Sequence, residues 1–129
     1  QHDLFSGTAR SIFFSSKYRV TNQCDRMGYR LKGPSVQSIR APLLSEGISL
    51  GAIQIPVDGQ PIVLLNDCQT IGGYPKIGAV LSCDLGHLAQ CNPGALVRFE
   101  SIPINGAQEI LRQIKAKMET IQLKVCERR

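Results

Sequence analysis

Short runs of alternating apolar and polar residues, separated by glycine and proline, occupy most of the chain. Alternation with a period of two is typical of β-strands, because successive side chains point to opposite faces of a sheet. The pattern predicts short strands at residues 11–14, 18–21, 27–31, 52–57, 61–65, 77–81 and 97–101. Residues 1–10 are mostly polar, and we predict a frayed connector there.

The strongest local signal is a hairpin between residues 52–57 and 61–65. Asp58-Gly59 is a dipeptide that favours tight two-residue turns, because both central positions of such a turn need a positive φ. A turn centred there pairs Ile55 with Ile62 and Ile53 with Leu64. These four apolar residues then share the core face of the hairpin, and Gln54 points the other way.

Two helices are predicted in the second half of the chain. Asp84 is a candidate N-cap for a short helix that ends at Gln90, before Asn92-Pro93-Gly94. A longer terminal helix spans residues 105–129, with Asn105 and Gln108 placed as in a capping box. Apolar residues at helical spacing form one stripe along it, which we expect to pack against a partner surface: Ala107, Ile110, Leu111, Ile114, Met118 and Ile121.

Many short strands, Gly/Pro turns and one terminal helix predict a mainly β, barrel-like fold with short helices. A chain of 129 residues is expected to be a single domain over residues 1–129. The hydrophobic fraction of 43% and charged fraction of 19% are ordinary for a soluble globular protein. No apolar run approaches the ~18 residues of a membrane span, so we predict no membrane partner.

Charge and cysteine content narrow the function classes further. The net charge is +5, and residues 105–129 supply +3 of it, from six Lys/Arg against three Glu. No aromatic residue accompanies this basic tail, so we predict no nucleic-acid partner. Cys83, His87 and Cys91 follow one another at four-residue spacing, but a fourth metal ligand is missing, so no metal site is predicted. The five cysteines contain no CxxC pair and indicate reduced thiols in a cytoplasmic protein.

A polar, glycine-rich loop follows the hairpin. Four polar residues, Asn66, Asp67, Gln69 and Thr70, precede Gly72-Gly73-Tyr74-Pro75-Lys76. The glycines allow close approach of a ligand or another chain, and Pro75 fixes the backbone that presents Tyr74 and Lys76. The same residues are also compatible with a plain loop that has a packed Tyr and a solvated Lys. Arg26 and Arg30 flank the strand at 27–31, where they either clamp an anion or pair with Asp25 or Glu46.

Five motifs occur in a fixed order: DRMGYRL at 25–31, SEG at 45–47, GAIQIP at 51–56, DGQP at 58–61 and QTIGGYPK at 69–76. This set resembles the carboxyltransferase family known as allophanate hydrolase subunit 2, which includes the C subunit of bacterial 5-oxoprolinase and part of urea carboxylase. The resemblance runs from about Tyr18 to Phe99, and Cys24 and Cys68 depart from the family pattern. It implies a cyclophilin-like β-barrel and the C-terminal part of a longer carboxyltransferase-type subunit.

The resemblance also implies a function. The chain is expected to belong to a complex that hydrolyses an amide with ATP or transfers a carboxyl group from biotin to a urea-like substrate. ATP is then a cofactor of the parent complex, bound to this chain or elsewhere, and biotin is the alternative cofactor. The expected partner resembles allophanate hydrolase subunit 1 or the B subunit of 5-oxoprolinase, and the chain alone is expected to be inactive. A non-catalytic regulator that binds a partner such as a histidine-kinase inhibitor is the alternative.

The candidate site residues are the polar groups of these motifs. Lys76, Tyr74 and Gln54 are the predicted catalytic residues, because cationic and amide donors stabilise charge on a carbonyl or carboxyphosphate oxygen, and Tyr or Lys can move a proton. The predicted substrate-binding residues are Arg26, Arg30, Asp67, Gln69, Thr70, Gly72 and Gly73. We expect Lys76 and Gln54 to be exposed, so that their replacement leaves folding nearly unaffected.

Overall fold

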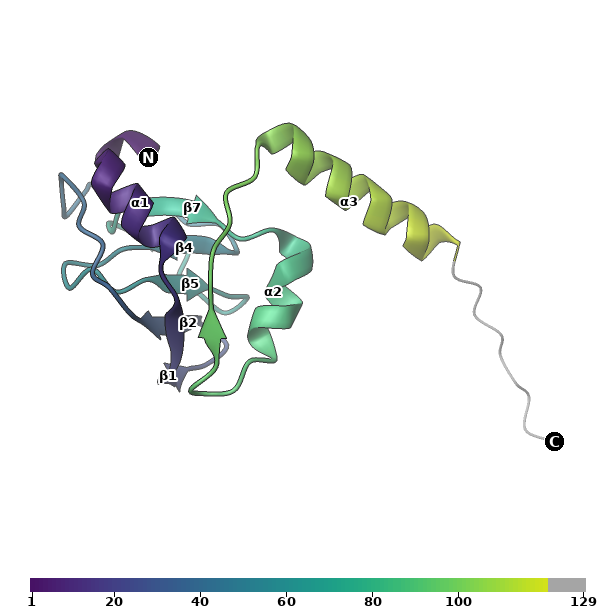
Figure 1. The fold of residues 1–129 in the computed structure, drawn as a ribbon, viewed down its shortest axis with the longest axis horizontal. Coiled ribbons are helices and arrows are strands. Elements are labelled where there is room, and N and C mark those ends of the chain that lie inside the picture. Colours follow the sequence, from purple (N-terminus) through teal and green to yellow (C-terminus); the bar gives the residue numbers. More distant parts are fainter. Residues whose placement is uncertain (121–129) are drawn as a thin grey trace.

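The computed structural model describes residues 1–120 and has a mainly β architecture, in agreement with the alternation (Figure 1). The helices are η1 (His2–Leu4, a 3-10 turn), α1 (Gly7–Ser15), α2 (Ser82–Ala89) and α3 (Ile104–Glu119). The strands are β1 (Tyr18–Cys24), β2 (Gly28–Lys32), β3 (Glu46–Gly47), β4 (Ala52–Gln54), β5 (Ile62–Leu64), β6 (Ile71–Gly72), β7 (Lys76–Ala79) and β8 (Leu96–Val97).

Six strands form one antiparallel sheet in the order β7-β4-β5-β2-β1-β8, which curls into half a barrel. The remaining two, β3 and β6, pair with each other in a separate two-stranded sheet that we call the flap. The strands predicted at 18–21 and 27–31 are present as β1 and β2. The strand predicted at 77–81 is β7, and only Ile77 of it is buried because β7 lies at a sheet edge.

The hydrophobic core lies between one face of this sheet and the helices α1 and α2. Phe13 of α1 is 1% exposed, and its ring stacks on Phe99 with centroids 4.6 Å apart. Tyr18, Leu31 and Ile53 contribute to the same cluster from three different strands. We call this side of the sheet the core face and the opposite side the outer face.

Helix α1 corrects the prediction for the first 15 residues, which the alternation alone makes a connector and a strand. Ser6 is its N-cap, and the Ser6 side chain accepts a hydrogen bond from the Ala9 amide at 3.1 Å. The buried residues Ala9 and Phe13 are four apart, which is the spacing of one helix face. The consecutive apolar residues at 12–14 resemble a strand only when this cap is overlooked.

The hairpin is confirmed, but its predicted register is wrong by one residue. Ile53 pairs with Val63, and Gln54 pairs with Ile62. The connection is longer than a two-residue turn: the Gly59 amide donates to the Pro56 carbonyl at 2.9 Å, and Gly59 alone in it has a positive φ, of +75°. Ile62 therefore shares a face with Gln54 and not with Ile55.

Both C-terminal helices are present with different ends. Helix α2 begins after Leu81, so Asp84 lies in its first turn and is not the cap. Helix α3 begins after Pro103 with no side-chain cap, and it projects away from the sheet (Figure 1). No described residue of α3 is buried, so residues 1–120 do not provide the partner surface that we expect for its stripe. Residues 121–129 of the predicted helix, including Ile121, lie outside the described residues.

Candidate functional site

Three of the predicted site residues lie in one row across the outer face of the sheet. Directly opposite partners on antiparallel strands share a face, and the pairs run from Lys76 to Gln54, from Gln54 to Ile62, and from Ile62 to Arg30. With strands ~4.8 Å apart, this row of four residues is roughly 14 Å long. The register that the sequence alone did not predict is what aligns Lys76, Gln54 and Arg30.

A groove of about 510 Å³ lies over the Arg30 end of this row. Its walls come from β1, β2, the 56–61 connection and Tyr74, and Ile62 belongs to its lining. Thr21 fixes the neighbouring backbone, because its hydroxyl donates to the Arg30 carbonyl at 2.9 Å. Arg30 and Lys32 bring two positive charges into the groove, and Asp58 brings one negative charge. The groove is therefore polar and cationic, with Tyr74 as an aromatic wall.

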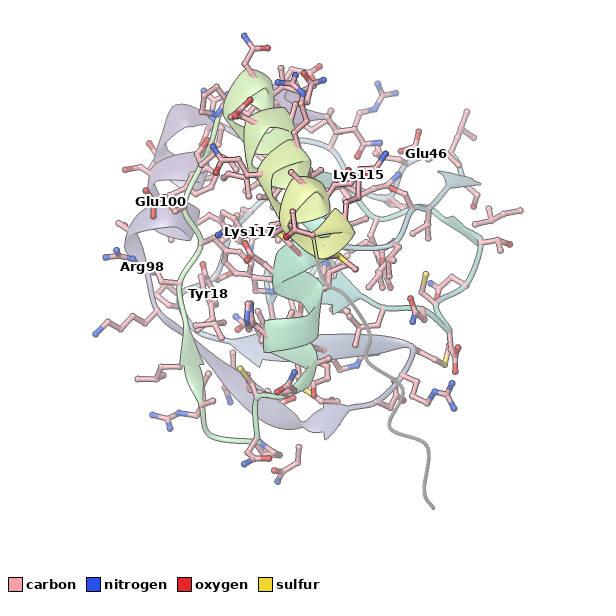
Figure 2. The ribbon with its side chains drawn as sticks, turned by 90° about the vertical axis from the view of Figure 1, so that its right-hand side faces the viewer. Tyr18, Glu46, Arg98, Glu100, Lys115 and Lys117 are labelled. Atoms are coloured by element: carbon pink, nitrogen blue, oxygen red, sulfur yellow. The ribbon has the colours of Figure 1, made fainter. Side chains whose placement is uncertain are left out.

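At the other end of the row, Lys76 connects the sheet to the flap. Its Nζ lies 2.5 Å from Oε1 of Glu46 in β3, and its side chain is only 16% exposed. The Gln1 side chain joins this cluster, since its amide donates to Glu46 and its Oε1 accepts from the Lys76 backbone amide. Figure 2 shows Glu46 on the opposite side of the molecule from Arg98 and Glu100. The expectation of a freely exposed Lys76 is wrong, because its side chain is held against the flap.

Gln54 lies beneath the flap, in the middle of the row. It is 1% exposed, and its Nε2 has no hydrogen-bond partner among the described residues. The expectation that Gln54 is exposed is therefore also wrong. Gly72 of β6 lies directly over it: a Cβ at Gly72 would come within 2.9 Å of Gln54 Nε2 and 2.6 Å of Ile48 Cδ1. The absence of a side chain at Gly72 is what lets the flap sit this close to the sheet.

The other predicted residues lie outside this row. Gly73 adjoins the flap, and a Cβ there would come within 2.7 Å of the Leu43 carbonyl. Arg26 pairs with Asp67 at 3.1 Å in an exposed ion pair, and not with the Asp25 or Glu46 carboxylate. Gln69 and Thr70 are exposed in the loop before β6. Eight of the ten predicted residues thus fall into a groove end, a flap end and a separate ion pair, and the other two lie in the exposed loop before β6.

Sequence reasoning missed two charged residues that the structure brings into these regions. Lys32 lines the groove two residues after Arg30, on the same face of β2. Glu46 neutralises Lys76. The alternation along residues 28–32 could have identified Lys32, whereas nothing local in the sequence indicates the pairing of Glu46 with a residue 30 positions later.

Residues 1–120 contain neither a candidate metal cluster nor a helix that could span a membrane. No group of three or more His, Cys, Asp or Glu side chains there is arranged to hold a metal ion. None of the described helices has the length and apolar character needed to cross a bilayer.

Comparison with known proteins identifies the class to which this fold and groove belong. Residues 1–101 match the family model described as carboxyltransferase domain, subdomain A and B. The chain is 35% identical over 124 residues to the 5-oxoprolinase C subunit of Haemophilus influenzae and 42% identical over 100 residues to that of Escherichia coli. The chain therefore belongs to this carboxyltransferase-domain family, as its motifs indicated.

The matched regions are parts of longer proteins. The alignments cover 95% and 77% of this chain, but only 40% of the Haemophilus protein and 32% of the Escherichia protein. The crystal structure of Kluyveromyces lactis urea carboxylase superposes on 98% of this chain with a TM-score of 0.86, at 23% identity, over 12% of that protein. This last likeness shows the shared fold, which extends to α3.

Proposed function

We propose that this chain is the C-terminal part of a subunit in an amide-hydrolysing complex of the 5-oxoprolinase type, and that its outer-face groove forms part of the substrate site. The observation that carries the proposal is the 42% identity over 100 residues to the 5-oxoprolinase C subunit, together with the family match over residues 1–101, which contain the groove and the row. A biotin-dependent carboxyltransferase complex acting on urea is the related alternative, supported by the fold shared with urea carboxylase. The companion subunit supplies the rest of the site.

We assign different tasks to the predicted catalytic residues within this proposal. Tyr74 and Arg30 face the groove, where a phenol and a guanidinium can bind a small amide and stabilise negative charge on its oxygen. Gln54 offers an unpartnered amide donor one strand away, under the flap. Lys76 reaches a ligand only when its ion pair with Glu46 opens, so in this conformation it is a positioning residue for the flap.

The cofactors implied by these relatives can be compared with the residues present. Arg30 and Lys32 have no carboxylate partner within 4 Å among the described residues, and they fit a phosphate or carboxylate group. ATP, when bound in the complex, supplies phosphoryl activation of the amide oxygen. The residues of this chain then bind and orient the amide and keep it against the sheet.

The experiment is a turnover assay of the assembled complex with 5-oxoproline and ATP. We expect Tyr74→Phe and Arg30→Gln each to lower kcat/KM roughly tenfold or more, the order expected for loss of one charge-stabilising group. Arg10→Gln is the matched control, because Arg10 lies in α1 on the core-face side and makes its described contacts with His2. Full activity of both groove variants would refute the proposed site, and detectable hydrolysis by this chain alone would refute its dependence on a companion.

A further inference from the structure

Three cations stand together on the outer face of β1 and β2. Arg19 pairs directly with Lys32 across the two strands, and Arg30 lies two residues before Lys32 on the same face. Side chains that are directly opposite on antiparallel strands have Cβ atoms about 5 Å apart, and like charges at this position destabilise a sheet. The sheet therefore concentrates positive charge at Arg30 and Lys32, which line the groove, and at Arg19 beside Lys32, where the fold itself gains nothing from it.

The structure does not neutralise this charge with acidic side chains. The ion pairs of residues 1–120 involve other cations, and none of the three has a carboxylate within 4 Å. Arg19 donates one hydrogen bond to the Gly94 carbonyl at 3.1 Å. Asp58, the acid of the groove, accepts from the Gln60 amide at 3.0 Å. Arg30 and Lys32 consequently keep their donors available to a ligand.

We propose that Arg30, Lys32 and Arg19 bind the phosphate groups of a small polyphosphate-bearing ligand. Arginine presents a planar fork to two phosphate oxygens, and lysine adds a mobile point charge. Three cations match an anion with several charges better than a single carboxylate. The groove volume of about 510 Å³ is in the range of small-molecule sites. This inference rests on the proposed function, because an ATP-dependent reaction on an amide requires the phosphate groups of ATP to lie close to that amide.

Direct binding, measured by titration calorimetry at low salt, tests this without turnover. The protein is the full polypeptide that contains this chain, and the probes are tripolyphosphate, ADP and citrate. We expect saturable binding of tripolyphosphate that weakens roughly tenfold in Arg30→Gln and in Lys32→Gln, as for loss of a charge-assisted contact. Tighter binding of ADP than of tripolyphosphate would identify a nucleotide, and the reverse order would identify a free polyphosphate.

Controls separate a built site from general charge attraction. Arg10→Gln removes the same charge from the other side of the sheet and should leave the affinity unchanged. Arg30→Lys keeps the charge without the fork and should give an intermediate loss. Equal weakening in Arg10→Gln, citrate binding as tight as tripolyphosphate, or no saturable binding would each overturn the inference. If binding fails while Tyr74→Phe still lowers amide turnover, the proposed function stands and only the phosphate site falls.

Discussion

Helices α1 and α3 are both amphipathic, but only α1 packs its apolar side chains into the core. Helix α1 has a short, irregular apolar pattern and places Ala9 and Phe13 in the core. Helix α3 has the most regular stripe of the chain, but Ile110 and Leu111 are each 38% exposed and Met118 is 66% exposed. Figure 2 shows α3 in front of the sheet, carrying Lys115 and Lys117. An amphipathic pattern therefore indicates a helix, and it does not show that the partner surface lies within the same chain.

A substitution at Phe13 should give the largest effect that distinguishes the packed helix α1 from the exposed helix α3. Phe13→Ala removes a side chain that stacks on Phe99 and lies near Tyr18, with ring centroids 5.9 Å apart. We expect the free energy of unfolding to fall by about 3–5 kcal/mol, as for other buried aromatic truncations. Urea unfolding measures the change, and Phe14→Ala, at a partly buried position of the same helix, is the control that should lose less. A loss equal to that of Phe14→Ala would place α1 outside the core.

A smaller effect is expected from ionisation next to α1. Burial raises the pKa of Tyr18 above its ordinary value of 10.0, and a hydrogen bond with the Ser16 side chain partly opposes this shift. Folding favours the neutral phenol, so its stabilisation is complete below pH 10.0 and is lost as the pH rises through the higher folded-state pKa. Unfolding free energies between about pH 8 and pH 11 should decline less steeply in Tyr18→Phe. Part of the decline should persist, because burial also raises the pKa of Tyr29.

The smallest effect is expected in α3. Ile114→Asp places a carboxylate in the stripe, and because no described residue of α3 is buried, it should change the stability of residues 1–129 by about 0.5 kcal/mol or less. The measurement is the thermal unfolding of Ile114→Asp compared with that of Gln113→Asp, which adds the same group to a neighbouring exposed position. A loss of several kcal/mol confined to Ile114→Asp would show that α3 packs against its own chain.

Local chemistry predicted much of the fold. Gly/Pro punctuation and alternation located β1, β2, β4, β5 and β7, cap and stop signals located α2, and periodicity located α3. The hairpin register could not be obtained this way, because the 56–61 connection is fixed from outside: the Val36 amide donates to the Gly59 carbonyl at 2.9 Å. Helix α1 could not be predicted from periodicity either, because the segment before its Ser6 cap has no periodic pattern that marks the start of a helix.

The sequence predicted some residues of the candidate site by their chemistry, but it missed Lys32 and Glu46 and it did not predict the arrangement. The chemistry of Arg30, Gln54 and Lys76 indicates a site, and only cross-strand pairing shows that they form a row. The burial of Gln54 and the neutralisation of Lys76 depend on the flap, whose two short strands are separated by 23 residues in sequence. Contacts between residues so far apart in sequence produce no local periodic pattern, so they cannot be predicted from the sequence in this way.

The buried, unpartnered amide of Gln54 bears on how the stability of this protein can be changed by mutation. A buried amide donor without a partner costs about 1–3 kcal/mol, so an apolar residue of similar shape, such as methionine, would be expected to raise the melting temperature. Selection for thermal tolerance alone would thus tend to remove this glutamine, and under the catalytic role proposed for it, selection for activity would retain it. If that proposed role holds, directed evolution under heat and under substrate limitation should select different residues at position 54.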